Sequence, residues 1–132
     1  MSNTNKYDLF KHIVTLEKEV LDFGFYWDNL EQILNQIRNE CIEVKEAYEK
    51  SDRAHLKEEV GDLIHATMSL AVFLNLDPKL TLEKSMAKMQ KRFNTLVELV
   101  KADGLPNLHH KPTSVKMSYW DKAKKSDHIA SY

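Results

Sequence analysis

The chain is almost free of helix-breaking residues, with three glycines and three prolines in 132 residues. Between them, apolar side chains recur at intervals of three and four, the period of an amphipathic helix, and the two-residue alternation of a strand is absent. We therefore predict an all-α fold, a four-helix bundle with a C-terminal tail helix, formed as a single domain over residues 1–132. The expected helices span about 5–23, 28–49, 53–76, 78–102 and, in the tail, 114–125.

Local signals mark several of the expected helix boundaries. The first helix is expected to stop at Gly24, because glycine commonly follows the last turn of a helix. Asp28 and Glu31 have the spacing of a capping box at the start of the second helix. Asp77 followed by Pro78 is typical of an N-cap and the first helical position, and this pair predicts the start of the fourth helix.

Charge, hydropathy and cysteine content argue against several classes of protein. Nineteen basic and twenty acidic residues give a net charge of −1, so the chain as a whole does not attract nucleic acid or an anionic membrane. No apolar run approaches the roughly 20 residues of a membrane-spanning helix, and the polar start MSNTNKYD is unlike a signal peptide. The single cysteine, Cys41, cannot form an intramolecular disulfide, which favours a reducing, cytoplasmic setting. Cys41 falls within an apolar stripe, so we expect it to be buried.

Two pairs of acidic residues flank the apolar faces of the second and third expected helices. Glu40 and Glu43 lie along one edge of the second helix's stripe, and Glu59 and Asp62 lie along the same rotational side of the third. With Ser51 at the centre of a turn, Glu43 comes level with Glu59. Glu40 then comes level with Asp62. The two stripes are Leu30, Leu34, Ile37, Cys41, Val44 and Tyr48, and Leu56, Val60, Leu63, Thr67, Leu70 and Leu74.

Four carboxylates that meet on one hairpin need a counter-charge, because like charges so close cannot all stay ionised in a partly dry site. A divalent cation resolves this conflict, and ligands that offer only oxygen suit Mg²⁺, with Mn²⁺ as the alternative. Gly61 lies mid-helix, where glycine costs about 1 kcal/mol relative to alanine. We interpret it as a point where a neighbouring backbone or a ligand comes close. Either acidic pair alone is more often a solvated surface pattern, so the hypothesis depends on the match between the two.

At these acidic segments the sequence resembles a known family. ECIEVKEAY (40–48) and EEVGDLIH (58–65) are similar to the signature of MazG-type nucleoside triphosphate pyrophosphohydrolases, members of the all-α NTP pyrophosphatase superfamily. Three further segments share the resemblance: YWDNLEQ (26–32), AKMQKRF (87–93) and SYWDKAKK (118–125). The resemblance implies a magnesium site made of four catalytic carboxylates, those of Glu40, Glu43, Glu59 and Asp62.

Two basic residues and a tryptophan complete the candidate site. Lys88 and Arg92 are i,i+4 neighbours at the edge of the fourth helix's apolar stripe. Beside four metal-binding acids, we assign them to the phosphate oxygens of a substrate. The alternative is a salt bridge to the acidic helices. Trp120 either stacks on a base or anchors the tail, and the sequence leaves these two roles open.

The predicted function is Mg²⁺-dependent hydrolysis of a nucleoside or deoxynucleoside triphosphate to the monophosphate and pyrophosphate. In this scheme Glu43 takes the proton of the attacking water. One alternative keeps the chemistry on a narrower substrate, which would be dUTP or dCTP, phosphoribosyl-ATP or a modified nucleotide. The other alternative is a catalytically silent helical interaction module.

The segment LIHATMSLAVFLNL (63–76) is apolar on more than one side of its helix. Met68 and Val72 lie well off the stripe, so a monomer would leave an apolar patch uncovered. We therefore expect a homodimer or homotetramer with an interface that includes Met68 or Val72, and the family resemblance implies self-association too.

Overall fold

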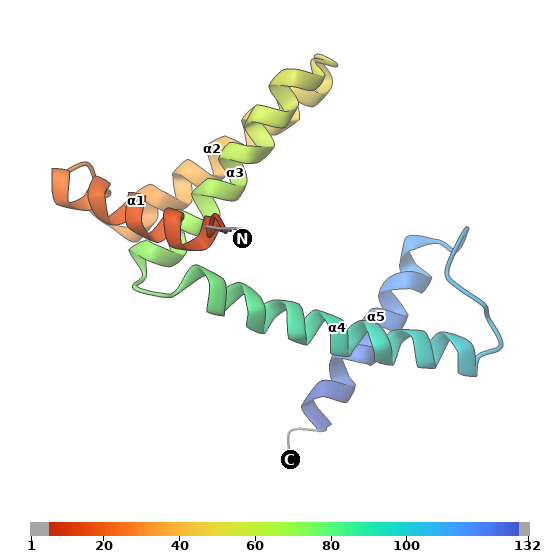
Figure 1. Cartoon of the computed structure of the whole chain (residues 1–132). Helices are drawn as coiled ribbons and strands as arrows, with labels where there is room; N and C mark the ends of the chain where they lie inside the picture. The colour runs from red at the N-terminus through yellow and green to blue at the C-terminus, as the bar shows by residue number, and fades with distance from the viewer. Residues whose placement is uncertain (1–5, 130–132) are drawn as a thin grey trace, which may run out of the picture. The chain divides into compact units, whose positions relative to one another are not determined.

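The computed structural model describes residues 6–129, and side chains as far as residue 127. Within this part of the chain every regular element is an α-helix, and no strand occurs. The all-α, bundle-type fold class with a C-terminal helix is therefore confirmed. The helices are α1 (Leu9–Phe23), α2 (Leu30–Glu49), α3 (Arg53–Phe73), α4 (Pro78–Ala102) and α5 (Thr113–Ile129) (Figure 1).

The chain forms two compact units, Met1–Thr81 and Leu82–Tyr132. The first unit contains α1, α2, α3 and the first turn of α4. The second contains the rest of α4 together with α5. The expectation that residues 1–132 make a single domain stays a prediction.

Side-chain caps set the helix starts in the first unit. Asp8 accepts a hydrogen bond from the Lys11 backbone N–H, so α1 begins at Leu9 and not near residue 5. At the start of α2, Asn29 Oδ1 accepts from the Gln32 backbone N–H at 3.0 Å, and Gln32 Oε1 accepts from the backbone N–H of the residue before Asn29 at 2.7 Å. The capping box predicted for Asp28 and Glu31 is therefore wrong by one residue.

A tight turn joins α2 to α3, and these two helices lie side by side as an antiparallel hairpin (Figure 1). Ser51 takes up a left-handed conformation with φ 56°, which reverses the chain within three residues. Asp52 then caps α3 by accepting from the His55 backbone N–H at 3.1 Å. The turn thus lies where the sequence predicted it. The hairpin brings together residues of α2 and α3 that are equally far from Ser51.

The face that α2 buries differs from the predicted stripe. Its buried residues are Ile33, Glu40 and Ala47, each seven positions after the last, which is the spacing of a seam between two helices packed side by side. Glu40 therefore lies on the buried face and not at its edge. Cys41 and Tyr48 are exposed, so the expected burial of Cys41 is wrong.

At the end of the first unit, α4 begins as predicted. Asp77 Oδ1 accepts from the Leu80 backbone N–H at 3.0 Å, and Pro78 is the first helical residue. The helix α5 is longer than the segment expected for the tail. It is held to α4 by an ion pair of 2.5 Å between Arg92 Nε and Asp127 Oδ2. The buried residues of the second unit are Val100, Tyr119 and Ala123.

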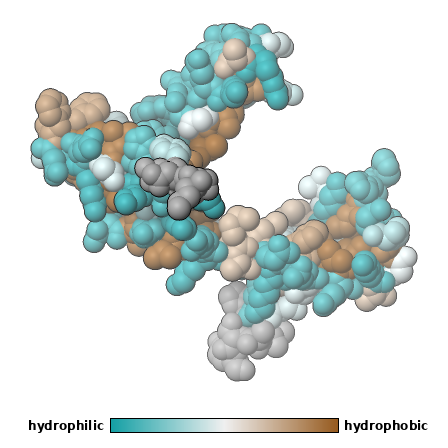
Figure 2. Space-filling model, viewed as in Figure 1, coloured by the Kyte–Doolittle hydropathy of each residue, from teal (hydrophilic) through white to brown (hydrophobic). Residues whose placement is uncertain are grey.

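Much apolar surface remains exposed in both units, and Figure 2 shows it between hydrophilic patches. On α4, four apolar side chains at helical spacing are each 37–59% exposed: Leu82, Met86, Met89 and Phe93. On α3, Val60 and Ile64 are exposed, whereas Met68 and Val72 are half-buried. Among the described residues, no helix is long and apolar enough to cross a membrane.

Candidate metal centre

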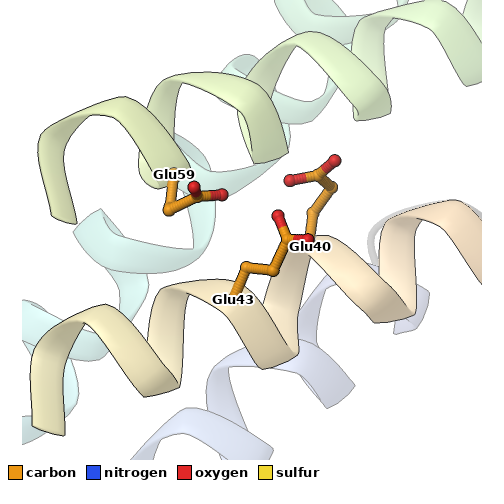
Figure 3. Close-up of side chains that lie close together, drawn as sticks. All are labelled: Glu40, Glu43 and Glu59. Atoms are coloured by element: carbon orange, nitrogen blue, oxygen red, sulfur yellow. The ribbon is translucent and has the colours of Figure 1, made fainter. Parts of the chain in front are cut away.

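Three glutamates converge across the α2–α3 hairpin. Glu40 and Glu43 extend from α2 toward Glu59 on α3, as Figure 3 shows. One carboxylate oxygen from each of the three lies within 4.8 Å of the other two. The short turn at Ser51 produces this meeting, because it places the facing surfaces of the two helices in matching register.

Burial makes this cluster unusual. Glu40 is only 9% exposed and the Glu59 side chain 12%, while Glu43 is open to solvent. The Oε2 atoms of Glu40 and Glu59 are buried and have no hydrogen-bond partner within the described part of the chain. A buried carboxylate oxygen without a partner is costly, and a bound ion is one of the explanations that such a group calls for.

The electrostatics of the cluster favour protonation in the absence of a cation. Burial raises the pKa of Glu40, and the neighbouring carboxylate of Glu43 raises it further. The close carboxylate of Glu43 raises the pKa of Glu59, burial adds to that rise, and His55 opposes it. A divalent cation would reverse this preference, because it stabilises the ionised form of every carboxylate it binds.

Two polar residues hold the buried carboxylates, each from one helical turn earlier. Gln36 Nε2 donates to Glu40 Oε1 at 2.7 Å, and His55 Nε2 lies 2.9 Å from Glu59 Oε1. Each contact engages Oε1 and leaves Oε2, the unpartnered oxygen, free for another ligand. Sequence reasoning missed both residues. Their i,i+4 spacing from the two glutamates was the available signal.

Asp62, the predicted fourth ligand, is exposed and does not belong to the set of three whose oxygens converge. It is nevertheless close enough for its charge to raise the pKa of Glu40. Gly61 has open space where a side chain would begin, with no neighbouring atom within 4 Å of that position. The expected close approach of a neighbouring backbone is therefore wrong within this chain, and the approach of a ligand stays a prediction.

The basic residues and the tryptophan assigned to substrate lie in the second unit, Lys88 and Arg92 on α4 and Trp120 on α5. Arg92 pairs with Asp127 of α5, and Trp120 is half-buried. Their assignment to phosphate and base stays a prediction.

The donor set suits a hard cation. Carboxylate oxygens are the protein ligands that Mg²⁺ and Mn²⁺ prefer, and Mg²⁺ usually keeps several waters and takes few protein ligands. Two partly buried carboxylates with unpartnered oxygens, beside a third that solvent can reach, meet that description.

The region that contains the three glutamates is similar in sequence to known proteins. A family model described as the MazG nucleotide pyrophosphohydrolase domain matches residues 28–97. The nucleoside triphosphate pyrophosphohydrolase/pyrophosphatase MazG of Thermotoga maritima is 37% identical over 112 residues, which cover 85% of this chain and 42% of that protein. The nucleoside triphosphate pyrophosphohydrolase of Escherichia coli is 33% identical over 92 residues, covering 68% of this chain and 35% of that protein. The chain thus spans less than half the length of these curated relatives.

Proposed function

The chain belongs to the MazG nucleotide pyrophosphohydrolase family, and from this premise we propose that it hydrolyses nucleoside triphosphates to the monophosphate and pyrophosphate with the aid of Mg²⁺. The convergence of Glu40, Glu43 and Glu59 carries the proposal, together with two buried oxygens that have no hydrogen-bond partner in the described part of the chain. The match to the family model confirms, at the level of the family, the resemblance stated from the sequence.

The three converging glutamates would hold the cation, and Asp62 would add its negative charge beside them. The chemistry that bound Mg²⁺ supplies is neutralisation of phosphate charge and a lowered pKa for coordinated water. Gln36 and His55 keep the buried carboxylates turned inward, so that little reorganisation is needed when substrate arrives. Mn²⁺ is the expected substitute ion.

We assign the general base to Glu43. It is the exposed member of the cluster, so it alone of the three faces the solvent from which both water and substrate come. A carboxylate within hydrogen-bond reach of the attacking water can accept its proton. The buried Glu40 and Glu59 are better suited to binding the cation.

Lys88 and Arg92 are assigned to the phosphates of the substrate. Arg92 donates through Nε to Asp127, and because a guanidinium has five N–H donors, this ion pair is compatible with phosphate binding by the remaining ones. Trp120 keeps its two proposed roles, base stacking or anchoring of α5.

The decisive experiment is a panel of ribonucleotides and deoxynucleotides with Mg²⁺, read out as pyrophosphate, in isotopically labelled water. We expect pyrophosphate as product and the label in the monophosphate, which locates the attack at the α-phosphorus. Orthophosphate as product, or no reaction with any nucleotide, would overturn the proposal. Hydrolysis confined to dUTP, dCTP, phosphoribosyl-ATP or a modified nucleotide would favour the narrower substrate range. The absence of hydrolysis with every nucleotide would favour the catalytically silent interaction module.

We also propose that the chain works as a homodimer or homotetramer in the cytoplasm. The exposed apolar side chains of α3 and α4 support self-association, since a monomer would leave them in water. Met68 and Val72 are half-buried, so Val60 and Ile64 offer more of the apolar surface on α3.

A further inference from the structure

A second feature of the first unit has no part in the carboxylate cluster. A cavity of about 320 Å³ opens between α1, α3 and the connection from α1 to α2. Three consecutive aromatic residues of that connection line it, Phe25, Tyr26 and Trp27, and their exposed fractions are 79%, 60% and 42%. Aromatic rings exposed around a hollow of this size are typical of a binding site for a flat ligand.

One wall of the cavity is polar. Glu17 of α1 is only 19% exposed, and its Oε1 receives two contacts from α3, at 2.8 Å from His65 Nε2 and 2.7 Å from Ser69 Oγ. Two contacts on one oxygen fix the carboxylate and leave Oε2 able to accept from a ligand. A fixed acceptor in a cavity that is otherwise mainly apolar favours a ligand that brings an N–H donor to that wall.

The cavity lies on the same hairpin as the carboxylate cluster. Ile33, which lines the cavity, is about two turns before Glu40 on α2, and His65 is about two turns after Glu59 on α3. Both offsets run away from the Ser51 turn, so cavity and cluster are separated along the hairpin by roughly 10 Å at 1.5 Å per residue. That separation is comparable with the length of a nucleoside triphosphate from its phosphates to its base.

We infer that this cavity is the nucleobase subsite, and that it prefers a base with an amino group at the position where the corresponding keto base has a carbonyl, that is, adenine or cytosine. The base lies against the aromatic residues of the α1–α2 connection, and its amino group donates to Glu17 Oε2. His65 and Ser69 are positioning residues that hold Glu17 in place. The inference rests on the proposed function, and it assigns Trp120 to anchoring α5.

The test compares nucleotides in which the amino group is replaced by a carbonyl and the adjoining ring nitrogen gains a hydrogen. CTP against UTP and ATP against ITP are such pairs, and kcat/KM for the amino member should be at least about tenfold higher, because a carbonyl oxygen facing Glu17 leaves two acceptors unpaired. Glu17→Gln should abolish or reverse that ratio, since a side-chain amide can donate to the carbonyl. Trp27→Ala should raise KM for all four nucleotides by about tenfold and leave the ratio unchanged.

A matched control is Glu19→Gln, which makes the same chemical change at an exposed position of α1 that does not line the cavity. It should leave every ratio as in the wild type. Ser69→Ala provides a second, milder variant if Glu17→Gln does not fold by circular dichroism, because it removes one of the two contacts on Glu17. It should reduce the amino-to-carbonyl ratio without abolishing it.

A binding measurement separates this inference from the proposed function. In a Trp120→Phe background Trp27 is the remaining tryptophan, and cytidine or adenosine without metal should quench its fluorescence whether or not the protein hydrolyses triphosphates. Quenching without pyrophosphate release from any nucleotide would sink the enzymatic proposal and keep the subsite. Pyrophosphate release with unchanged ratios in Glu17→Gln, or loss of the ratio in Trp120→Ala, would overturn the subsite and keep the enzyme. An absence of quenching, as expected if a second copy of the chain fills the cavity, would also overturn it.

Discussion

Gln36 donates a 2.7 Å hydrogen bond from its side-chain amide to Oε1 of Glu40, one helical turn further along α2. On α3 the same spacing joins His55 to Glu59. Both buried carboxylates are therefore held on one oxygen by their own helix, and the other oxygen of each is buried without a hydrogen-bond partner among the described residues. The orientation of each candidate ligand is thus set by a contact within its own helix.

The first prediction concerns this hold on Glu40. Gln36→Leu keeps much of the side-chain volume but removes the donor, so the carboxylate loses its fixed orientation. We expect Mn²⁺ affinity, measured by calorimetry, to fall by about 10–100-fold, the usual effect of losing a group that orients a metal ligand. Gln90→Leu on α4 is the control, since Gln90 donates to the exposed Asn94 one turn further along the same helix. Equal affinity in the Gln36 variant and the wild type would contradict a positioning role.

The second prediction concerns the acids at the edge of the cluster. Glu43→Ala should lower kcat by about 10²–10⁴-fold, the range typical for loss of a general base. Asp62→Ala should also abolish most turnover, while circular dichroism stays helical because removing one charge relieves repulsion. Glu46→Ala, at an exposed position of the same helix α2, is the control. Near wild-type activity in either Glu43→Ala or Asp62→Ala would end the proposal for that residue.

The third prediction concerns the dependence of stability on pH. The pKa values of Glu40 and Glu59 are raised above 4.5 in the folded protein. Above pH 4.5 the folded state therefore binds more protons than the unfolded state, and linkage makes these two groups reduce stability as pH rises through their raised pKa values. In metal-free buffer the melting temperature should fall over that window, and less steeply in Glu40→Gln.

Mg²⁺ should reverse that fall. A ligand present at 100 times its Kd stabilises the folded state by about 2.7 kcal/mol, so millimolar Mg²⁺ should raise the melting temperature near neutral pH. Glu40→Gln should show a smaller rise. Two results together would refute the site: a melting temperature that does not change with Mg²⁺, and identical pH profiles of melting temperature in the wild type and Glu40→Gln.

The fourth prediction separates phosphate binding from cation binding. Lys88→Ala and Arg92→Ala should raise KM for the triphosphate by about tenfold or more, as expected for lost charged contacts, and leave Mn²⁺ affinity unchanged. Arg92→Ala also removes the ion pair to α5, so Asp127→Ala, which breaks the same pair, is its control. If Lys88→Ala and Arg92→Ala both retain wild-type kinetics, the basic edge of α4 has no role in binding.

The fifth prediction concerns assembly. Light scattering at micromolar concentration should give at least twice the 15.4 kDa mass of the chain, because the exposed apolar side chains of α3 and α4 need cover. Ile64→Lys or Met86→Lys should shift the particle toward a monomer, since a charge in an apolar interface is costly. A wild-type particle of 15 kDa would show that the surface is left to solvent.

The sequence predicted the parts of the fold that depend on local chemistry. The turn at Ser51 and the Asp77–Pro78 start of α4 follow from a few neighbouring residues, and the structure has both. Because the turn is correct, the register that brings Glu43 to Glu59 is correct as well.

One error concerns a choice between two neighbouring caps, and the other concerns which face of α2 is buried by packing. Asn29 and Gln32 form the cap of α2 one residue after the predicted pair, and two adjacent polar residues offer nearly equal caps. The buried seam runs through Ile33 and Glu40, whereas hydrophobicity alone put Cys41 inside. A hydrophobic pattern cannot predict a buried carboxylate, because the burial of a charged group is unfavourable unless other interactions compensate for it.

The short connection between α2 and α3 has a consequence for the folding of the chain. Glu43 and Glu59 are close in sequence, so the entropy lost in bringing them together is small and the hairpin can form early. Closing it, however, brings the negative charges together before the rest of the chain can compensate for them. In the absence of a cation, repulsion between the carboxylates should therefore slow the closure of the hairpin. We therefore expect divalent ions to change how fast the chain folds, in addition to how stable the folded chain is.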